Sequence, residues 1–183
     1  MNRIRTVSCF QVSGPASVEP NEERQLQMLD VYPEFARRGP GGGENRVTGT
    51  YVEITTTDGP SGLFGPIFDE TAPIIQAKLA GRLIGQDPLA FEFLWDVLYR
   101  GDRHARAGYE MMAISAVDCA LWDLRGKIMG LPVYRLLGGP TRPHVDCYAS
   151  MLGHSLDPGL VRARARAMVD QGFKAQKWFF RYG

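Results

Sequence analysis

A long apolar segment from Gly108 to Gly139 constrains the fold of this chain more than any other feature. It reads GYEMMAISAVDCALWDLRGKIMG and continues LPVYRLLGG. Hydrophobic residues lie almost all round the helix that its first part would form, and only Ser115, Asp118 and Arg125 leave a narrow polar stripe. We therefore expect this helix to be buried between two layers of the fold.

The same segment contains signals that end the helix. Gly130 can adopt the left-handed conformation that ends many helices, and Pro132 cannot continue one. Gly126 lies inside the helix, where glycine costs roughly 1 kcal/mol relative to alanine, so we expect it to allow another backbone to approach closely. Asp123 and Lys127 are four residues apart with the acid first, which predicts an ion pair worth about 0.2–0.5 kcal/mol.

Composition and charge narrow the class of protein. The chain has 183 residues, of which 44% are hydrophobic and 22% charged, as is usual for a globular protein of one or two domains. Its 21 basic and 20 acidic residues give a net charge of +1. The protein therefore has no strong electrostatic field that would attract nucleic acid or an anionic membrane surface. The first residues read as a strand instead of a secretory leader, and no apolar stretch is long enough to cross a membrane. We expect a cytoplasmic protein.

Cysteine and histidine spacings do not favour a metal centre. Cys9, Cys119 and Cys147 are odd in number and lie far apart in apolar settings, so we expect buried, reduced thiols. The 3 histidines show neither His-x-His nor His-Glu-x-x-His spacing. A zinc site is therefore not indicated.

Two β-strands are expected in the N-terminal part of the chain. The first runs from Ile4 to Val12, and the second, from Val47 to Thr57, is rich in β-branched residues. The two strands should pair. The long connection between them contains a glycine-rich run at 39–43 that lacks the residues of a phosphate-binding loop. Connections of this length are usually lids or disordered segments.

Two further helices should follow the turn-rich segment at 59–66. The first can be capped by Asp69, and its apolar stripe would be Ile75, Leu79 and Leu83. Asp87 and the proline after it predict the start of the second, in which aromatic and aliphatic residues lie at helical spacing and should form core: Phe91, Leu94, Trp95 and Leu98. Two strands followed by three helices predict an α+β domain.

The C-terminal part of the chain reads as one parallel βαβ unit. Residues 145–150 form the first strand, Asp157 and a following proline open a helix that Gly172 ends, and residues 175–180 form the second strand. A parallel sheet built in this way needs packed layers on both of its faces. The expected elements include no third strand to extend this sheet.

The sequence at residues 113–139, AISAVDCALWDLRGKIMGLPVYRLLGG, and the following VDCYAS at 145–150 resemble a known family. They are similar to the junction between the capping domain and the barrel in the mandelate racemase/muconate lactonizing enzyme branch of the enolase superfamily. The resemblance implies an α+β capping domain at residues 1–140, followed at 141–183 by the first βαβ unit of a (β/α)8 TIM barrel. Members of that branch are longer, so we expect this chain to be an N-terminal half that is inactive alone.

The resemblance also implies a function. Such enzymes depend on Mg2+ and remove the α-proton of a carboxylate substrate, and the interpretation we favour is an acid-sugar dehydratase that forms a homo-oligomer. The metal ligands are expected as carboxylates on later strands, beyond Gly183, so no metal ligand is assigned in this chain. In the family the loop between the first two strands closes over the barrel mouth, which makes Arg37, Arg38 and Asn45 candidate substrate-binding residues.

Lys177 is the candidate catalytic residue. Side chains alternate across a strand, so Lys177 lies on one face while Gln176 and Trp178 lie on the other. If the bulky pair meets the helix layer, Lys177 points into the barrel near its C-terminal end, where active sites of such barrels lie. A lysine there can stabilise an enolate or, when deprotonated, remove a proton. The alternative is a strand-end lysine that contacts only solvent or an ion-pair partner.

Other assignments rest on weaker signals. His154 and Tyr148 lie near the end of the first barrel strand and are candidate substrate contacts, although Tyr148 could equally be a core residue. In the family the inward positions of the second strand are often Lys-x-Lys; here Lys177 matches the first and Phe179 occupies the second. A racemase that uses both bases is therefore disfavoured relative to a dehydratase. The alternative enzyme is a racemase or cycloisomerase. The alternative outside enzymes is a noncatalytic interaction module, and the apolar residues 178–180 argue against that module.

Overall fold

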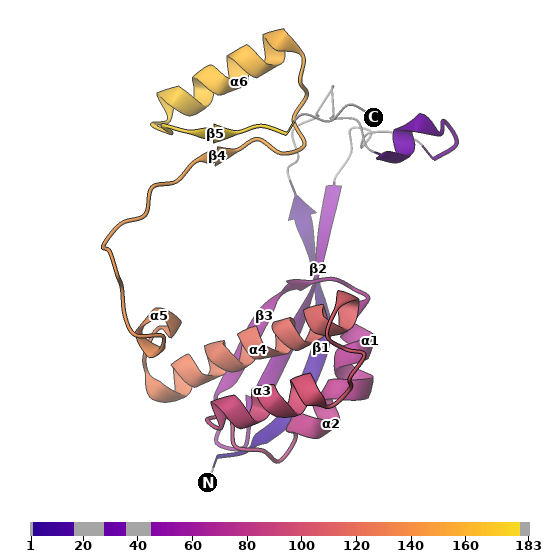
Figure 1. Cartoon of the computed structure of the whole chain (residues 1–183), viewed down its shortest axis with the longest axis vertical. Helices are drawn as coiled ribbons and strands as arrows, with labels where there is room; N and C mark the ends of the chain where they lie inside the picture. The colour runs from indigo at the N-terminus through magenta and orange to yellow at the C-terminus, as the bar shows by residue number, and fades with distance from the viewer. Residues whose placement is uncertain (1, 17–27, 36–44, 180–183) are drawn as a thin grey trace. The chain divides into compact units, whose positions relative to one another are not determined.

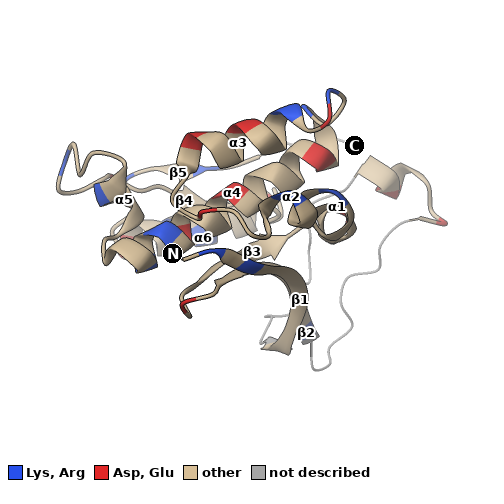
Figure 2. Cartoon of the chain, turned by 90° about the horizontal axis from the view of Figure 1, so that it is seen from below, with Lys and Arg blue, Asp and Glu red and all other residues tan. Residues whose placement is uncertain are grey.

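The computed structural model describes residues 2–16, 28–35 and 45–179 (Figure 1). The chain divides into two compact units, one made of residues 1–14 and 46–141 and the other of residues 15–45 and 142–183. Each unit is described by itself. Figure 2 shows basic and acidic positions interspersed along the ribbon, in keeping with the net charge of +1.

A three-stranded sheet forms one layer of the first unit. Strands β1 (Ile4–Ala16), β2 (Asn45–Thr56) and β3 (Ser61–Ile67) lie in the order β1-β2-β3. The prediction that the first two strands pair is confirmed. β2 and β3 are antiparallel, with Glu53 opposite Leu63. Between β1 and β2 the chain also forms a short 3-10 helix, η1 (Met28–Val31), which the sequence did not indicate.

Helix α4 (Gly108–Met129) is the central helix that the sequence predicts. It ends at Gly130, which has φ 66° and donates its N–H to the Gly126 carbonyl. A Cβ on Gly126 would lie 2.8 Å from the Leu131 carbonyl oxygen, so the predicted close approach of backbone at this position is confirmed. A short helix, α5 (Val133–Leu136), follows directly after Pro132.

The prediction of a polar stripe on α4 is wrong for one residue, Arg125. Ser115 is exposed and Asp118 is half-buried, but Arg125 is only 1% exposed. Its guanidinium lies over the ring of Phe91, and its Nε donates to the Pro88 carbonyl at 3.0 Å. These two partners allow a charged side chain to be buried where the helical pattern alone suggests a solvent-facing position.

Strand β3 was missed by the sequence-based interpretation, which read residues 59–66 as turns. β3 is an edge strand, where the proline at position 66 is tolerated. Gly62 faces α4 so closely that an added Cβ would lie 2.1 Å from the Ala120 carbonyl oxygen. A Cβ on Gly65 would lie 2.5 Å from the ring of Tyr51. The glycines here mark close approach of neighbouring groups rather than turns.

A helical segment follows β3. It consists of α1 (Thr71–Ile74), the π-helix η2 (Ile75–Leu79) and α2 (Ala80–Leu83). The predicted stripe is confirmed, because the side chains of Ile75, Leu79 and Leu83 are all buried. The predicted cap is wrong: the Asp69 carboxylate accepts a hydrogen bond from the Thr50 hydroxyl instead of capping the helix.

Helix α3 (Phe91–Arg100) begins later than the Asp-Pro signal predicts. Asp87 accepts a hydrogen bond from the Leu89 N–H at 2.9 Å in a turn that precedes the helix. The two leucines of the predicted stripe, at positions 94 and 98, are buried. Its aromatic residues are not core as expected: Phe91 is half-buried and Trp95 is 36% exposed.

Helices α1 to α4 cover one face of the sheet, as the two views agree (Figures 1 and 2). The core between the layers is formed by aliphatic side chains from both. Asp123 on α4 links the layers, because its Oδ2 accepts from the Leu63 N–H at 2.8 Å. The same oxygen lies 2.7 Å from Lys127 Nζ, which confirms the predicted ion pair.

The second unit contains the predicted parallel βαβ arrangement. Strands β4 (Ala149–Ser150) and β5 (Gln176–Lys177) are parallel and are joined by α6 (Pro158–Asp170). The strands are shorter than expected, but the helix cap is confirmed: Asp157 Oδ1 accepts from the N–H groups of Gly159 and Leu160 at 2.9 and 3.2 Å.

The cysteines are free, as expected, but they are not buried. Cys9 is half-buried, whereas Cys119 and Cys147 are exposed. Within the part of the chain that the structure describes, no helix combines the length and the apolar character needed to cross a membrane.

Alanine at position 62 should destabilise the first unit, because its Cβ would overlap the Ala120 carbonyl oxygen and force α4 away from β3. We expect Gly62→Ala to lower the free energy of unfolding by about 2–3 kcal/mol, as overpacking of a core does. Gly81→Ala is the matched control, since an added Cβ at this exposed position on α2 has no neighbour within 4 Å. It should leave stability unchanged or raise it by up to about 1 kcal/mol.

Urea unfolding of both variants of the full-length protein measures the difference. Equal unfolding midpoints for Gly62→Ala and the parent protein would contradict the close packing of α4 on β3.

Candidate functional site

The ends of β4 and β5 carry the residues with the best case for chemistry. Ser150 lies beside Lys177 in the parallel register, and Ala149 lies beside Gln176. Two backbone hydrogen bonds hold this register: Ala149 N–H to the Ala175 carbonyl at 3.0 Å, and Met151 N–H to the Lys177 carbonyl at 2.9 Å. Paired residues of parallel strands point to the same side of the sheet.

One face of this strand pair is turned toward α6. The Gln176 side chain donates to the Ala165 carbonyl of α6 at 2.8 Å, and its Oε1 accepts from the Trp178 indole N–H at 3.1 Å. Ala149, on the same face, is buried. Gln176 therefore lies on the side of the strand pair that faces α6, and the Trp178 indole is bonded to it.

The opposite face is open and carries Lys177. Its side chain is exposed, as are those of Ser150 and Tyr148. A hollow of about 610 Å³ at the strand ends is lined by Tyr148 and by residues 175–178, which include Lys177 and also Gln176 and Trp178. The structure thus brings two of the candidate residues, Tyr148 and Lys177, to one hollow at the strand ends. Ser150, level with Lys177 in the register, is a further polar group on this face.

His154 lies in a different hollow. This hollow has a volume of about 450 Å³, and its lining includes Tyr148, which precedes β4, together with Arg164 and Met168 from α6. The Nδ1 atom of His154 is buried and has no hydrogen-bond partner among the described residues. His154 therefore lies beside α6, and only Tyr148 lines both hollows.

The remaining candidate substrate contacts cannot be placed in the same way. Arg37 and Arg38 lie outside the described residues, as does the glycine-rich run at 39–43. Asn45 is the first residue of β2. The proposed closing role of this connection stays a prediction.

A metal centre is not formed by the described residues. No group of three or more His, Cys, Asp or Glu side chains within residues 2–16, 28–35 and 45–179 is arranged to hold a metal ion. This chain's described part therefore does not fit a Mg2+ site by itself.

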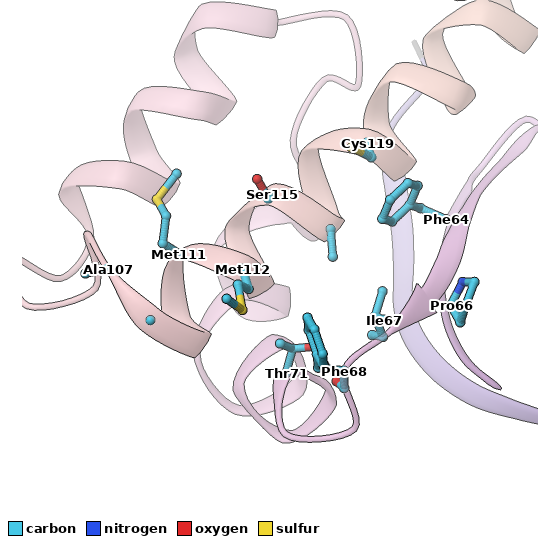
Figure 3. A pocket seen from close by; sticks show the side chains of 12 residues that line it. Phe64, Pro66, Ile67, Phe68, Thr71, Ala107, Met111, Met112, Ser115 and Cys119 are labelled. Atoms are coloured by element: carbon cyan, nitrogen blue, oxygen red, sulfur yellow. The ribbon is translucent and has the colours of Figure 1, made fainter. Parts of the chain in front are cut away.

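An apolar cavity of about 470 Å³ lies between β3 and α4 in the first unit (Figure 3). Phe64, Ile67 and Phe68 line one side, and Met112 on α4 lines another. The thiol of Cys119 is a polar group on its wall, and partial burial of the sulfur, together with the neighbouring charge of Asp118, raises the pKa of this thiol. The other groups on its wall are mainly apolar, so the cavity offers chiefly apolar contact.

The first unit has a second cavity, lined by aromatic residues of α3 that the helical spacing predicts as core. Its volume is about 350 Å³, and it lies between α3 and α4. Glu92, Trp95, Asp118, Trp122 and Arg125 line it with Phe91. The amphipathic spacing of α3 contained no signal that Trp95 would stay accessible.

Comparison with known proteins relates the chain to one family. Residues 44–138 match the family described as mandelate racemase/muconate lactonizing enzyme, N-terminal domain. The chain is 37% identical over 126 residues to a D-galactonate dehydratase from Ralstonia nicotianae, covering 67% of this chain and 32% of that protein. It is 36% identical over 138 residues to a D-mannonate dehydratase from Caulobacter vibrioides, covering 73% of this chain and 33% of that protein.

A solved structure agrees with these relatives. It is that of a mandelate racemase/muconate lactonizing protein from Paracoccus denitrificans complexed with magnesium, with a TM-score of 0.64 and 26% identity, covering 96% of this chain and 41% of that one. The chain thus spans about a third of the length of the dehydratases that it matches. The resemblance seen at residues 113–139 is confirmed, and the chain belongs to the mandelate racemase/muconate lactonizing enzyme family of the enolase superfamily, whose N-terminal capping domain it contains.

Proposed function

We propose that this chain is the N-terminal part of an acid-sugar dehydratase. Residues 1–140 would form its capping domain, and residues 141–183 would begin its (β/α)8 barrel. The relatives named as D-galactonate and D-mannonate dehydratases support the substrate class. The parallel unit formed by β4, α6 and β5 supports the start of a barrel, because such barrels are built from repeated units of this kind.

The observation that carries the proposal is the placement of Lys177. Its side chain lies on the open face of β5, at the C-terminal end of the strand, while Gln176 is bonded to α6 on the other face. In (β/α)8 enzymes the active site lies at this end of the strands. An exposed ammonium group here is available to a carboxylate substrate.

The proposed reaction removes water from the substrate. A basic group of the enzyme takes the proton from the carbon next to the carboxylate, and the electron pair of the broken C–H bond is delocalised onto the carboxylate as an enediolate. The β-hydroxyl group then takes a proton from an acidic group and leaves as water. The resulting enol becomes a 2-keto acid. Lys177 would place positive charge beside the oxygens on which negative charge develops, which lowers the barrier most when the donor is already oriented.

We include magnesium in the proposal because the Paracoccus denitrificans relative is described as complexed with it. A divalent ion would supply further charge for the enediolate. Because the described residues form no metal site, we place its ligands outside them and derive no step through the ion.

Further parts of the proposal follow from the family. Tyr148 shares the hollow with Lys177 and is proposed to contact substrate, and His154 is proposed to support it from the neighbouring hollow. Arg37 and Arg38 are proposed to contribute from the connection between β1 and β2, and Asn45 from the start of β2. The whole enzyme would be a cytoplasmic homo-oligomer that needs the rest of its barrel for activity.

A racemase or cycloisomerase of the same family is the second candidate, which the family name of the Paracoccus denitrificans relative favours. Phe179, two residues after Lys177, occupies the position at which the family often has a second lysine. A one-base reaction such as dehydration therefore fits the strand better.

The reaction class can be tested with the full-length enzyme, Mg2+ and a panel of acid sugars that includes D-galactonate and D-mannonate. We expect a 2-keto acid to appear, detected as its semicarbazone, for at least one member of the panel. Racemisation or lactone formation without a keto acid would instead support the second candidate. No turnover of any carboxylate in the panel would count against both.

Lys177→Met should lower kcat by about 100- to 1000-fold, because it removes one preorganised donor while keeping the length and apolar packing of the stem. Its stability should change little, since the apolar stem of the side chain is kept. Lys174→Met is the matched control: it also removes an exposed lysine, three positions before Lys177, and should keep near-normal kcat. Steady-state kinetics on the full-length enzyme, with thermal unfolding alongside, compares the two. Near-normal kcat for Lys177→Met would show that Lys177 has no role in catalysis.

A further inference from the structure

Strands β1 and β2 continue past the helices of the first unit as a two-stranded arm (Figure 1). Strand β3 reaches only to the level of Thr50, which pairs with Ile67. Beyond this level, in the described part of the chain, no third strand joins β1 and β2. We call residues 10–13 of β1 and 46–51 of β2, whose side chains contact one another, the arm. A two-stranded ribbon is only marginally stable by itself, so a partner would stabilise the arm.

The inner face of the sheet, which the helices cover, changes from apolar to polar at the arm. Side chains alternate along a strand, so the even-numbered residues of β2 share this face. Val52 and Ile54 are buried in the core. In the arm, Ser13 Oγ instead accepts hydrogen bonds from the Thr48 hydroxyl at 3.0 Å and from Arg46 Nε at 3.3 Å. Hydrogen-bonding groups therefore replace core residues on this side.

The outer face of the sheet carries apolar side chains in the arm. Phe10, Val12 and Val47 are 40%, 52% and 58% exposed. The ring of Phe10 stacks on that of Tyr51, with centroids 6.1 Å apart. An exposed apolar patch on the side of a sheet that faces away from the core is typical of an interaction site. The arm thus has its apolar surface where its own unit provides no core.

Strand β1 also has an open edge along the arm. It is the outermost strand of the sheet. At its start this edge is covered, because the Ile4 N–H donates to the Gln86 carbonyl at 2.9 Å and the Ile4 carbonyl accepts from the Gly85 N–H at 2.8 Å. Residues 7–13, VSCFQVS, have no such cover among the described residues. They also contain no charge and no proline, which are the usual devices that keep edge strands from pairing.

The partner must offer both an unpaired strand edge and an apolar surface. A (β/α)8 barrel closes its own sheet and surrounds it with helices, so the barrel of the proposed enzyme offers no strand edge. A second copy of this chain offers both, because its β1 has the same edge and the same apolar side chains. We propose that two copies pair antiparallel through β1, which joins their sheets and makes the apolar faces of the two arms continuous.

The order of side chains selects the register of this pairing. In a pair centred on Gln11, Phe10 of each copy lies opposite Val12 of the other on the outer face. On the inner face, Gln11 lies opposite Gln11. A pair centred on Phe10 would instead place Ser8 opposite Val12, a polar residue against an apolar one. The register centred on Gln11 matches apolar residues with apolar residues and polar with polar.

A lysine on the arm tests the surface in the full-length protein. The parent protein should sediment as a dimer or a larger even-numbered assembly. We expect Val12→Lys to raise the Kd of this self-association about 100-fold, because the two-fold axis places the new charge twice in the joined apolar face. Leu63→Lys is the matched control: it makes an apolar-to-lysine change at an exposed position of β3, at the opposite edge of the sheet, and should leave the assembly unchanged. Sedimentation velocity compares the three proteins.

Cross-linking tests the register. Gln11→Cys places two thiols at the two-fold axis, where opposite Cα atoms lie about 4.5–5.5 Å apart, within the range of a disulfide. Ser8→Cys is the matched control, because its two copies would lie six residues apart along the strands, or roughly 20 Å. After mild oxidation of the full-length variants, we expect a covalent dimer for Gln11→Cys on non-reducing electrophoresis. Ser8→Cys should match the parent, whose native cysteines set the background.

Three results would overturn the proposal. One is a full-length parent protein that stays monomeric at its highest soluble concentration. Another is an assembly that withstands Val12→Lys, which would show that something else, such as the barrel of the same chain, covers the arm. The third is equal cross-linking of Gln11→Cys and Ser8→Cys. If circular dichroism shows that Val12→Lys does not fold, the cross-linking result decides. Because none of these measurements depends on turnover, they are independent of the dehydratase assignment.

Discussion

The close contact between α4 and β3 is the constraint on which the rest of the first unit depends. At Gly62 the strand has no side chain, and the carbonyl oxygen of Ala120 occupies the space where a Cβ would lie. The Asp123 carboxylate then reaches the Leu63 N–H on the same strand. With the helix fixed in this way, its opposite side faces α3, where the Arg125 guanidinium is covered by the Phe91 ring. The α3–α4 cavity is a consequence of this arrangement.

Elements whose signals are local could be predicted from the sequence. Gly130 ends α4 and Asp157 begins α6 where the sequence places them, because a left-handed glycine and a capping carboxylate act within one turn of the helix. The stripe from Ile75 to Leu83 is buried as expected, since helical periodicity reflects which side faces the core. The βαβ unit could be recognised for the same reasons.

Features that depend on distant contacts could not be predicted. Gly62 and Gly65 resemble turn residues until α4 and Tyr51 are placed beside them. Arg125 looks like a surface residue until Phe91 and the Pro88 carbonyl are found around it. In the candidate site, strand alternation was enough to place Lys177 opposite Gln176. It gave no indication that His154 would lie beside α6, because the path of the chain after a strand end has no periodicity.

The family relationship connects these observations to catalysis, and the orientation of Lys177 toward the substrate is its central claim. The most direct measurement is a crystal structure of the full-length protein with Mg2+ and an acid sugar of the proposed substrate class. We predict that Lys177 Nζ lies about 3 Å from a carboxylate oxygen of the substrate, or the same distance from its α-carbon, within the reach needed for charge stabilisation or proton transfer. A substrate bound at the barrel mouth with Lys177 Nζ directed away from it, beyond the reach of one bridging water, would contradict the account.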